Sequence, residues 1–116
     1  MKKSILAAAV MALMFPSPAS AAALCAGSVA HVYIYASGSV HIIGSWRNTL
    51  TQICNVKEEW KGIDTQTCFA WFSAVSSANV ENQQIAIYYG GLNQADCATI
   101  PHYGNAPAPV YIRLAE

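Results

Sequence analysis

Charged side chains are scarce in this chain. They make up 10 % of its 116 residues, whereas an average soluble protein has about 25 %. After the first three residues, four side chains are basic and six are acidic, so that part of the chain is slightly acidic. Proteins that bind nucleic acids usually carry a cluster of Lys and Arg. The charge balance therefore argues against a nucleic acid as partner.

Motifs of catalytic and metal sites are also missing. The chain has no GxSxG, HExxH or phosphate-loop pattern. Its four cysteines form no CxxC pair, and a structural zinc site needs ligands in two close pairs. His31, His41 and His102 fall in separate segments, and we interpret them as ordinary surface or loop histidines. We expect no catalytic residue, no metal ion and no cofactor.

Long hydrophobic runs are missing as well. The apolar run over residues 5–15 is shorter than the ~20 residues that a transmembrane helix needs, so we expect no membrane span. Two lysines precede this run and Ala-Ser-Ala follows at 19–21, which is the pattern of a secretory signal peptide cleaved after Ala21. We expect residues 1–21 to be removed and residues 22–116 to form one secreted or periplasmic domain.

All four cysteines lie in the part of the chain that is predicted to be exported, where oxidising conditions favour two disulfides. Four cysteines allow three connectivities. We favour a bridge from Cys54, at the end of a predicted strand, to Cys68, in the first turn of a predicted helix. Cys25 and Cys97 would then form the second bridge. A lipid anchor on Cys25 is an alternative, although Leu24 stands where a small residue would be expected.

Alternating apolar residues predict strands on both sides of one helix. Three strands are expected over residues 31–36, 40–46 and 50–56, with the first two joined by a turn around Gly38. Segments 85–89 and 110–114 alternate in the same way and follow the helix.

The helix is predicted from its first residues and from its apolar stripe. Asp64 is a good N-cap, because its side-chain oxygen can accept a hydrogen bond from the first turn. Asn79 is a reasonable place for the helix to end. Between them, apolar side chains recur at helical spacing and should face the sheet. The stripe consists of Cys68, Trp71, Phe72, Val75 and Ala78.

This order of elements predicts an α+β domain that is mainly β. Three strands, a helix and two strands is the order of the five-stranded Greek-key barrel that binds oligonucleotides or oligosaccharides, the OB-fold. Trp71 and Phe72 would then close one end of the barrel. An open antiparallel sheet with one helix across it is the alternative.

Aromatic residues on predicted outward faces suggest a binding surface. Amphipathic rings combined with few charges are typical of a surface that another molecule covers. That molecule could be a sugar or an identical subunit, and the alternative is that the tyrosines only complete the packing of the sheet. The residues expected to bind are Tyr33, Tyr35, Trp46, Arg47, Tyr88 and Tyr103.

Over residues 31–90 the chain resembles the receptor-binding B subunits of pentameric bacterial toxins of the subtilase-cytotoxin and typhoid-toxin type. The resemblance is carried by the segments HVYIYA, VHIIGSW, LTQICNV, CFAWFSAVSSANV and QQIAIYY. It implies an exported, disulfide-bonded OB-fold that assembles as a ring, associates with a toxin A-type chain and binds cell-surface glycans.

We therefore expect a non-enzymatic binding module for a glycan or a partner subunit. The alternative is a periplasmic protein inhibitor or interaction domain, which would use a loop such as Asn55 to Ile63 to enter an enzyme cleft.

Overall fold

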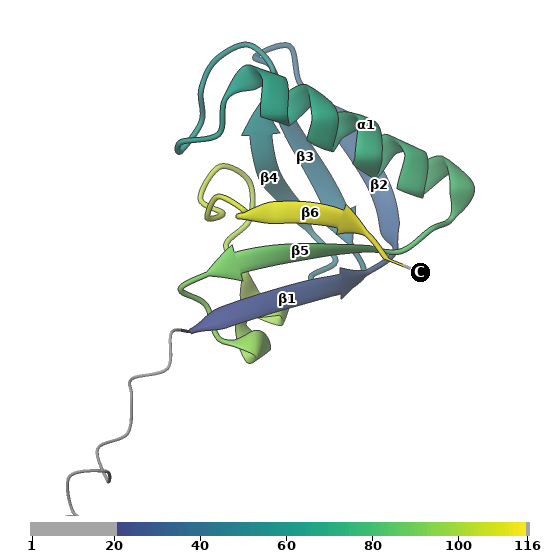
Figure 1. Cartoon of the computed structure of the whole chain (residues 1–116), viewed down its shortest axis with the longest axis vertical. Coiled ribbons are helices and arrows are strands. Elements are labelled where there is room, and N and C mark those ends of the chain that lie inside the picture. Colours follow the sequence, from purple (N-terminus) through teal and green to yellow (C-terminus); the bar gives the residue numbers. More distant parts are fainter. Residues whose placement is uncertain (1–20, 116) are drawn as a thin grey trace, which may run out of the picture.

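In the part of the chain that the structure describes, two three-stranded antiparallel sheets and one long helix make up the fold (Figure 1). The computed structural model describes residues 21–115, so the predicted signal peptide lies outside the described residues except for Ala21. One sheet has the order β1-β5-β6, built from β1 (Ala22–Gly27), β5 (Ile85–Gly90) and β6 (Tyr111–Leu114). The other has the order β2-β3-β4, built from β2 (Val29–Ile34), β3 (Ser39–Gly44) and β4 (Leu50–Asn55). The helices are α1 (Thr65–Glu81) and the 3₁₀-helix η2 (Gln94–Thr99).

The prediction of a closed five-stranded barrel is wrong. Each of the five predicted segments does contain a strand, but they separate into two sheets. The missing element is β1, whose residues Ala22 to Gly27 pair with β5 from Gly90 to Ile85. Alanine and glycine have low strand propensity, so the sequence of β1 gives little sign of a strand. β1 therefore takes one edge of β5, and β6 takes the other.

The two sheets meet where β1 leads into β2 through the single residue Ser28. Ser28 accepts a backbone hydrogen bond from Ser45 at 3.0 Å and donates one to the Ser45 hydroxyl at 3.1 Å. The Trp46 ring lies against Gly44, where an added Cβ would come within 2.5 Å of the ring. Trp46 is half-buried and packs against the core, so this side chain helps to build the joint between the sheets.

Helix α1 begins as predicted and ends later than predicted. The Asp64 side chain accepts a hydrogen bond from the Thr67 amide at 2.7 Å. The helix continues to Glu81, and Asn82 ends it in the left-handed conformation with φ 55°. Asn79 has a different role, because its amide nitrogen donates to the carbonyl oxygens of Val29 and Ala30 at 2.9 and 3.0 Å. This side chain therefore ties α1 to β2.

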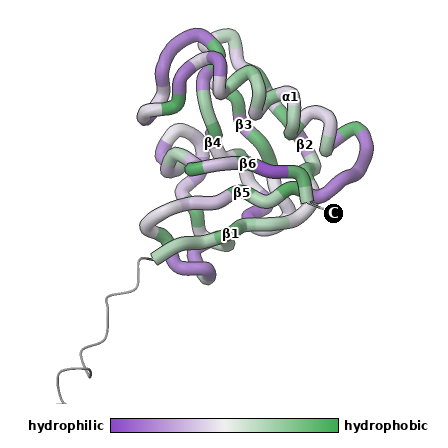
Figure 2. Tube along the Cα trace, in the orientation of Figure 1, coloured by the Kyte–Doolittle hydropathy of each residue, from purple (hydrophilic) through white to green (hydrophobic). Residues whose placement is uncertain are grey.

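One hydrophobic core lies between the helix and the sheets. From the predicted stripe of α1, Cys68, Val75 and Ala78 are buried, and Trp71 and Phe72 are partly buried against the core. Figure 2 shows hydrophilic residues gathered in the loop before α1 and in the turn after it. The buried stripe of α1 thus faces the core, while Phe69 and Val80 on the same helix remain exposed.

The disulfides join Cys25 to Cys97 and Cys54 to Cys68, which is the pairing that the sequence favoured. The first attaches β1 to η2 and the second attaches β4 to α1. Because Cys25 is bonded to Cys97, its sulfur is not free to carry the lipid considered above. Two disulfides fit an oxidising environment, outside the cell or in the periplasm.

Candidate binding surface

Three rings lie on one side of β2, the third of them from Tyr35, the residue that follows the strand. His31, Tyr33 and Tyr35 occupy alternate positions, so their side chains point to the same side of the strand. The ring centroids of His31 and Tyr33 are 6.2 Å apart, and those of Tyr33 and Tyr35 are 6.3 Å apart. Tyr33 is 42 % exposed and Tyr35 is 37 % exposed. Both tyrosine rings therefore remain accessible.

The line of rings continues from β2 across β3. Tyr35 stacks on His41 at 4.7 Å with 22° between the rings, and His41 meets Tyr103 edge-on at 5.9 Å. Tyr103, which is 48 % exposed, meets His102 at 5.3 Å. We call this set the aromatic row, and it contains all three histidines of the chain. Its members are His31, Tyr33, Tyr35, His41, His102 and Tyr103.

The turn between β2 and β3 brings His41 into the row. If the turn is centred on Ser37 and Gly38, residue 34 should face His41, but the structure pairs Tyr33 with His41. The turn contains an extra residue: the Tyr35 amide donates to the Ser39 carbonyl, and Gly38 has φ 95°. Glycine adopts this left-handed conformation without steric cost. The resulting register puts His41 on the same face as Tyr33.

Tyr103 is held beside β4 by backbone hydrogen bonds. Its amide donates to the Leu50 carbonyl at 2.8 Å, and its carbonyl accepts from the Gln52 amide at 3.2 Å. Tyr103 itself has φ 54°, an uncommon conformation for a non-glycine residue. This segment therefore covers part of the free edge of β4 and fixes the position of the Tyr103 ring.

Three cations hold the segments around the row. Lys61 Nζ donates to the carbonyl oxygens of Gly104 and Ala106 at 3.0 and 2.7 Å. Arg47 Nε donates to the Ile100 carbonyl at 2.7 Å. Lys57 Nζ donates to the carbonyl of Ala36, in the turn that follows Tyr35, at 2.7 Å. Each of these side chains thus bonds to the backbone of a loop next to the row.

His41 is the buried member of the row. It is 3 % exposed, and its Nδ1 has no hydrogen-bond partner among residues 21–115. Burial lowers the pKa of His41, because removal from water disfavours the charged imidazolium. His41 is therefore neutral at neutral pH, and it acts as an aromatic support beneath Tyr35.

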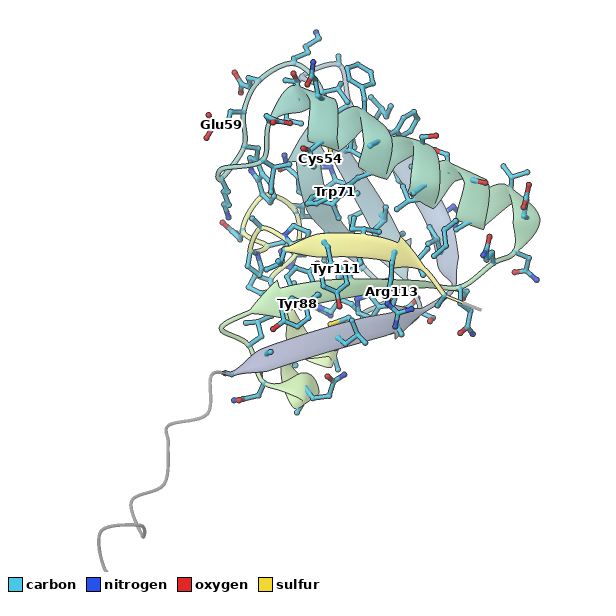
Figure 3. The ribbon with its side chains drawn as sticks, in the orientation of Figure 1. Cys54, Glu59, Trp71, Tyr88, Tyr111 and Arg113 are labelled. Carbon is cyan, nitrogen blue, oxygen red and sulfur yellow. A yellow bond between two sulfur atoms is a disulfide. The ribbon has the colours of Figure 1, made fainter. Side chains whose placement is uncertain are left out.

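A second aromatic surface lies on the β1-β5-β6 sheet. Tyr88 and Tyr111 are cross-strand partners, and their rings stack at 5.1 Å with 9° between them. Figure 3 shows both rings with Arg113 on the face of the sheet turned to the viewer. Because the two tyrosines cover each other, Tyr88 is only partly exposed.

The residues predicted to bind do not form one surface. Tyr33, Tyr35 and Tyr103 come together in the aromatic row, whereas Tyr88 lies on the other sheet. The Trp46 ring lies against Gly44 at the joint between the sheets. Arg47 donates a hydrogen bond to the Ile100 carbonyl.

Sequence reasoning left the three histidines out of the binding surface. The alternation on β2 already placed His31 with Tyr33 and Tyr35, so that signal was available for His31. Strand pairing brings His41 beside Tyr35, and loop position brings His102 beside Tyr103, and no local pattern predicts either contact.

The loop from Asn55 to Ile63 has an internally bonded backbone. The Asn55 side-chain oxygen accepts from the Lys57 and Glu58 amides at 2.7 and 3.2 Å. Trp60 and Ile63 exchange two backbone hydrogen bonds at 3.0 and 2.9 Å. Glu58 and Glu59 are exposed between these anchors. The loop therefore exposes the carboxylates of Glu58 and Glu59 on a backbone that its own hydrogen bonds hold in place.

Several kinds of site are not found between residues 21 and 115. That region contains no pocket and no group of three His, Cys, Asp or Glu side chains that could hold a metal ion. No helix in the described part of the chain is long and apolar enough to cross a membrane.

Comparison of the chain with protein-family models, with curated proteins and with solved structures gives no match. The resemblance to toxin B subunits therefore stays a prediction.

Proposed function

We propose that the exported protein is a non-enzymatic module that binds glycans through the aromatic row. The proposal is supported above all by the three tyrosine rings of Tyr33, Tyr35 and Tyr103, which stay exposed along the aromatic row. A tyrosine ring offers an apolar face on which the C–H side of a sugar can stack, and a hydroxyl that can hydrogen-bond to it. The imidazole nitrogens add donors and acceptors.

The surroundings of the row favour this use over a structural one. Rings that only complete a core become buried, as Tyr89 does at 0 % exposure. The rings of the row are instead supported from beneath by His41 and from the side by loops that Lys57, Lys61 and Arg47 hold in place. A pre-formed surface loses less conformational entropy when a ligand binds.

The test is a glycan array probed with the oxidised protein and with matched variants. Tyr33→Ala, Tyr35→Ala and Tyr103→Ala should each weaken binding by about 2- to 12-fold, which corresponds to 0.5–1.5 kcal/mol per ring contact. Tyr111→Ala removes an exposed ring from the other sheet and should leave binding unchanged.

Two results would contradict the proposal. One is an array without signal from the folded protein. The other is a loss of binding in Tyr111→Ala that the three variants of the row do not show.

A second candidate function is protein inhibition through the loop from Asn55 to Ile63. It is favoured by the hydrogen bonds that hold this loop in one conformation, because pre-organised loops bind enzyme clefts with little loss of entropy. Purified periplasmic hydrolases should then lose activity in the presence of the protein, and the double variant Glu58→Ala/Glu59→Ala should not inhibit them. If that variant still inhibits the hydrolases, the loop is not the inhibitory segment.

A ring of identical subunits and a toxin A-type chain are implied by the resemblance alone. The mass of the oxidised protein in solution, measured by light scattering, tests the ring. A mass of about five chains would support it, and a monomer would contradict it without affecting glycan binding by the aromatic row.

A further inference from the structure

The aromatic row also indicates which class of glycan it would bind. Resting on the proposed glycan-binding function, we propose that the ligand is an uncharged oligosaccharide that lies along the row as an extended chain of several sugar units. The alternative class is a single terminal sugar, charged or neutral, held by one part of the surface.

The length of the aromatic row favours an oligosaccharide of several units over a single sugar. The row follows β2 from His31 to Tyr35 and then turns across β3 to Tyr103, with neighbouring centroids between 4.7 and 6.3 Å apart. A pyranose ring is similar in size to one tyrosine ring, so a single sugar covers one side chain and leaves the others open. Only a ligand with several linked rings can occupy the whole row.

The distribution of exposure points the same way. The exposed fractions of Tyr33, Tyr35 and Tyr103 are 42 %, 37 % and 48 %, so no one ring dominates the surface. A terminal sugar is usually held by convergent groups around one position. Here the accessible rings are spread along a line, and each offers a separate stacking contact.

The orientation of the rings favours a single soluble oligosaccharide over the surface of a crystalline polysaccharide. The planes of His31 and Tyr33 differ by 54°, and those of Tyr33 and Tyr35 differ by 68°. Rings turned in this way cannot all lie flat on a crystalline sugar surface. They suit a single soluble chain whose successive units rotate about the glycosidic bonds.

The charges around the row favour a neutral ligand. The row contains Tyr and His only, and the buried His41 is neutral at neutral pH because burial lowers its pKa. The nearby cations Lys57, Lys61 and Arg47 donate to loop carbonyls, where they hold the surface in place. An acidic sugar needs a charged or multiple-donor partner when it leaves water. The row itself contains no Lys or Arg side chain.

The experiment uses affinity electrophoresis of the oxidised protein in gels that contain one polysaccharide each. The neutral probes are laminarin, xyloglucan and galactomannan, and the acidic probes are alginate and polygalacturonic acid. Oligosaccharides of one to six units from the retained polymer then compete in calorimetric titrations. We expect retardation by at least one neutral polymer, and a Kd that falls by about tenfold or more from the monomer to the trimer as further ring contacts form.

Variants separate contacts along the chain from general damage. Tyr33→Ala and Tyr103→Ala should flatten the dependence of Kd on chain length, whereas Tyr111→Ala should keep it. All three variants must show the circular dichroism spectrum of the wild type.

The possible outcomes test the extended ligand, the neutral ligand and the glycan-binding function separately. Competition by the monomer that equals that of the hexamer would overturn the extended ligand and keep the glycan-binding function. Retardation only by alginate or polygalacturonic acid would overturn the neutral ligand in the same way. No retardation in any gel, together with an empty glycan array, would overturn the glycan-binding function itself.

Discussion

The outer faces of the two sheets carry tyrosines in different arrangements. On the β1-β5-β6 sheet, Tyr88 and Tyr111 face each other across neighbouring strands and stack nearly parallel at 9°. On the β2-β3-β4 sheet, Tyr33 in β2 and Tyr35 just after it have ring planes that differ by 68°. Tyr88 and Tyr111 each cover one face of the other. Tyr33 and Tyr35 meet edge-on, and the face of Tyr35 is covered by His41 instead. The same residue type therefore gives an isolated stacked pair on one sheet and a longer row of rings on the other.

The sheets also differ in how the chain anchors them. The Cys25–Cys97 bridge, with a sequence separation of 72, attaches β1 to η2. The Cys54–Cys68 bridge, with a separation of 14, attaches β4 to α1. At the outer edge of β1, the Gln94 side chain adds two hydrogen bonds to the Leu24 backbone at 2.8 and 2.9 Å. The β1-β5-β6 sheet thus depends on contacts that are distant in sequence.

The largest expected effect tests this difference in anchoring. Cys25→Ala/Cys97→Ala should lower the free energy of unfolding by about 4 kcal/mol and Cys54→Ala/Cys68→Ala by about 3 kcal/mol, because the longer loop restricts the unfolded chain more. Each double variant removes two sulfur atoms, so each controls for the other. Urea unfolding measures both, and a greater loss in Cys54→Ala/Cys68→Ala would contradict the comparison.

A smaller loss of stability should separate two glycine-to-alanine variants, one in each sheet. An added Cβ at Gly44 would come within 2.5 Å of the Trp46 ring, whereas at Gly90 its nearest contact is Val110 at 3.8 Å. Neither glycine has a positive φ. Gly44→Ala should therefore cost about 1–3 kcal/mol through overpacking, and Gly90→Ala should stay within about 0.5 kcal/mol. Equal melting temperatures would show that Trp46 can move aside.

The third prediction concerns the pH dependence of the β2-β3-β4 sheet. Burial lowers the pKa of His41, so below pH ~6.5 the unfolded chain binds a proton that the folded chain does not. The stabilisation is complete above that pH and is lost as the pH falls toward the folded pKa. Its ring neighbours Tyr35 and Tyr103 and its strand partner Gln52 carry no charge that would stabilise the imidazolium.

The measurement is the urea midpoint between pH 7.5 and 5. The wild type should lose stability on acidification, and His41→Phe should lose less because it keeps a ring but cannot titrate. His102→Gln, which removes an exposed imidazole beside Tyr103, serves as the matched control. An identical pH profile for His41→Phe and the wild type would contradict the role given to His41.

The smallest effect is expected at a buried hydroxyl of the β1-β5-β6 sheet. Tyr89 is fully buried, and its hydroxyl has no partner among the described residues. Burial raises the pKa of Tyr89 well above its usual range, so the side chain stays neutral at physiological pH. Tyr89→Phe removes the unsatisfied hydroxyl and should raise the free energy of unfolding by up to about 1 kcal/mol. A clear loss of stability in calorimetry would show that the hydroxyl is hydrogen-bonded.

The candidate surface could be predicted from the sequence only in part. The alternation of β2 predicted that Tyr33 and Tyr35 share an outward face, because a strand has a fixed period of two. Arg47 has a side chain suited to sugars, but its hydrogen bond to the Ile100 carbonyl depends on a loop far along the chain. Trp46 was expected on an outward surface, but in the structure its ring lies against Gly44.

Local chemistry alone determined the start of α1 and the positions of β2 to β6. Asp64 as N-cap, the apolar stripe of α1 and the alternating strands each depend on neighbours within a few residues, so the sequence was sufficient for them. Tertiary structure decided the pairing of β1 with β5, which replaced the barrel by two sheets, and the approach of Tyr103 to His41. These contacts join residues that are distant in the chain, and their stability comes from packing that no short segment encodes.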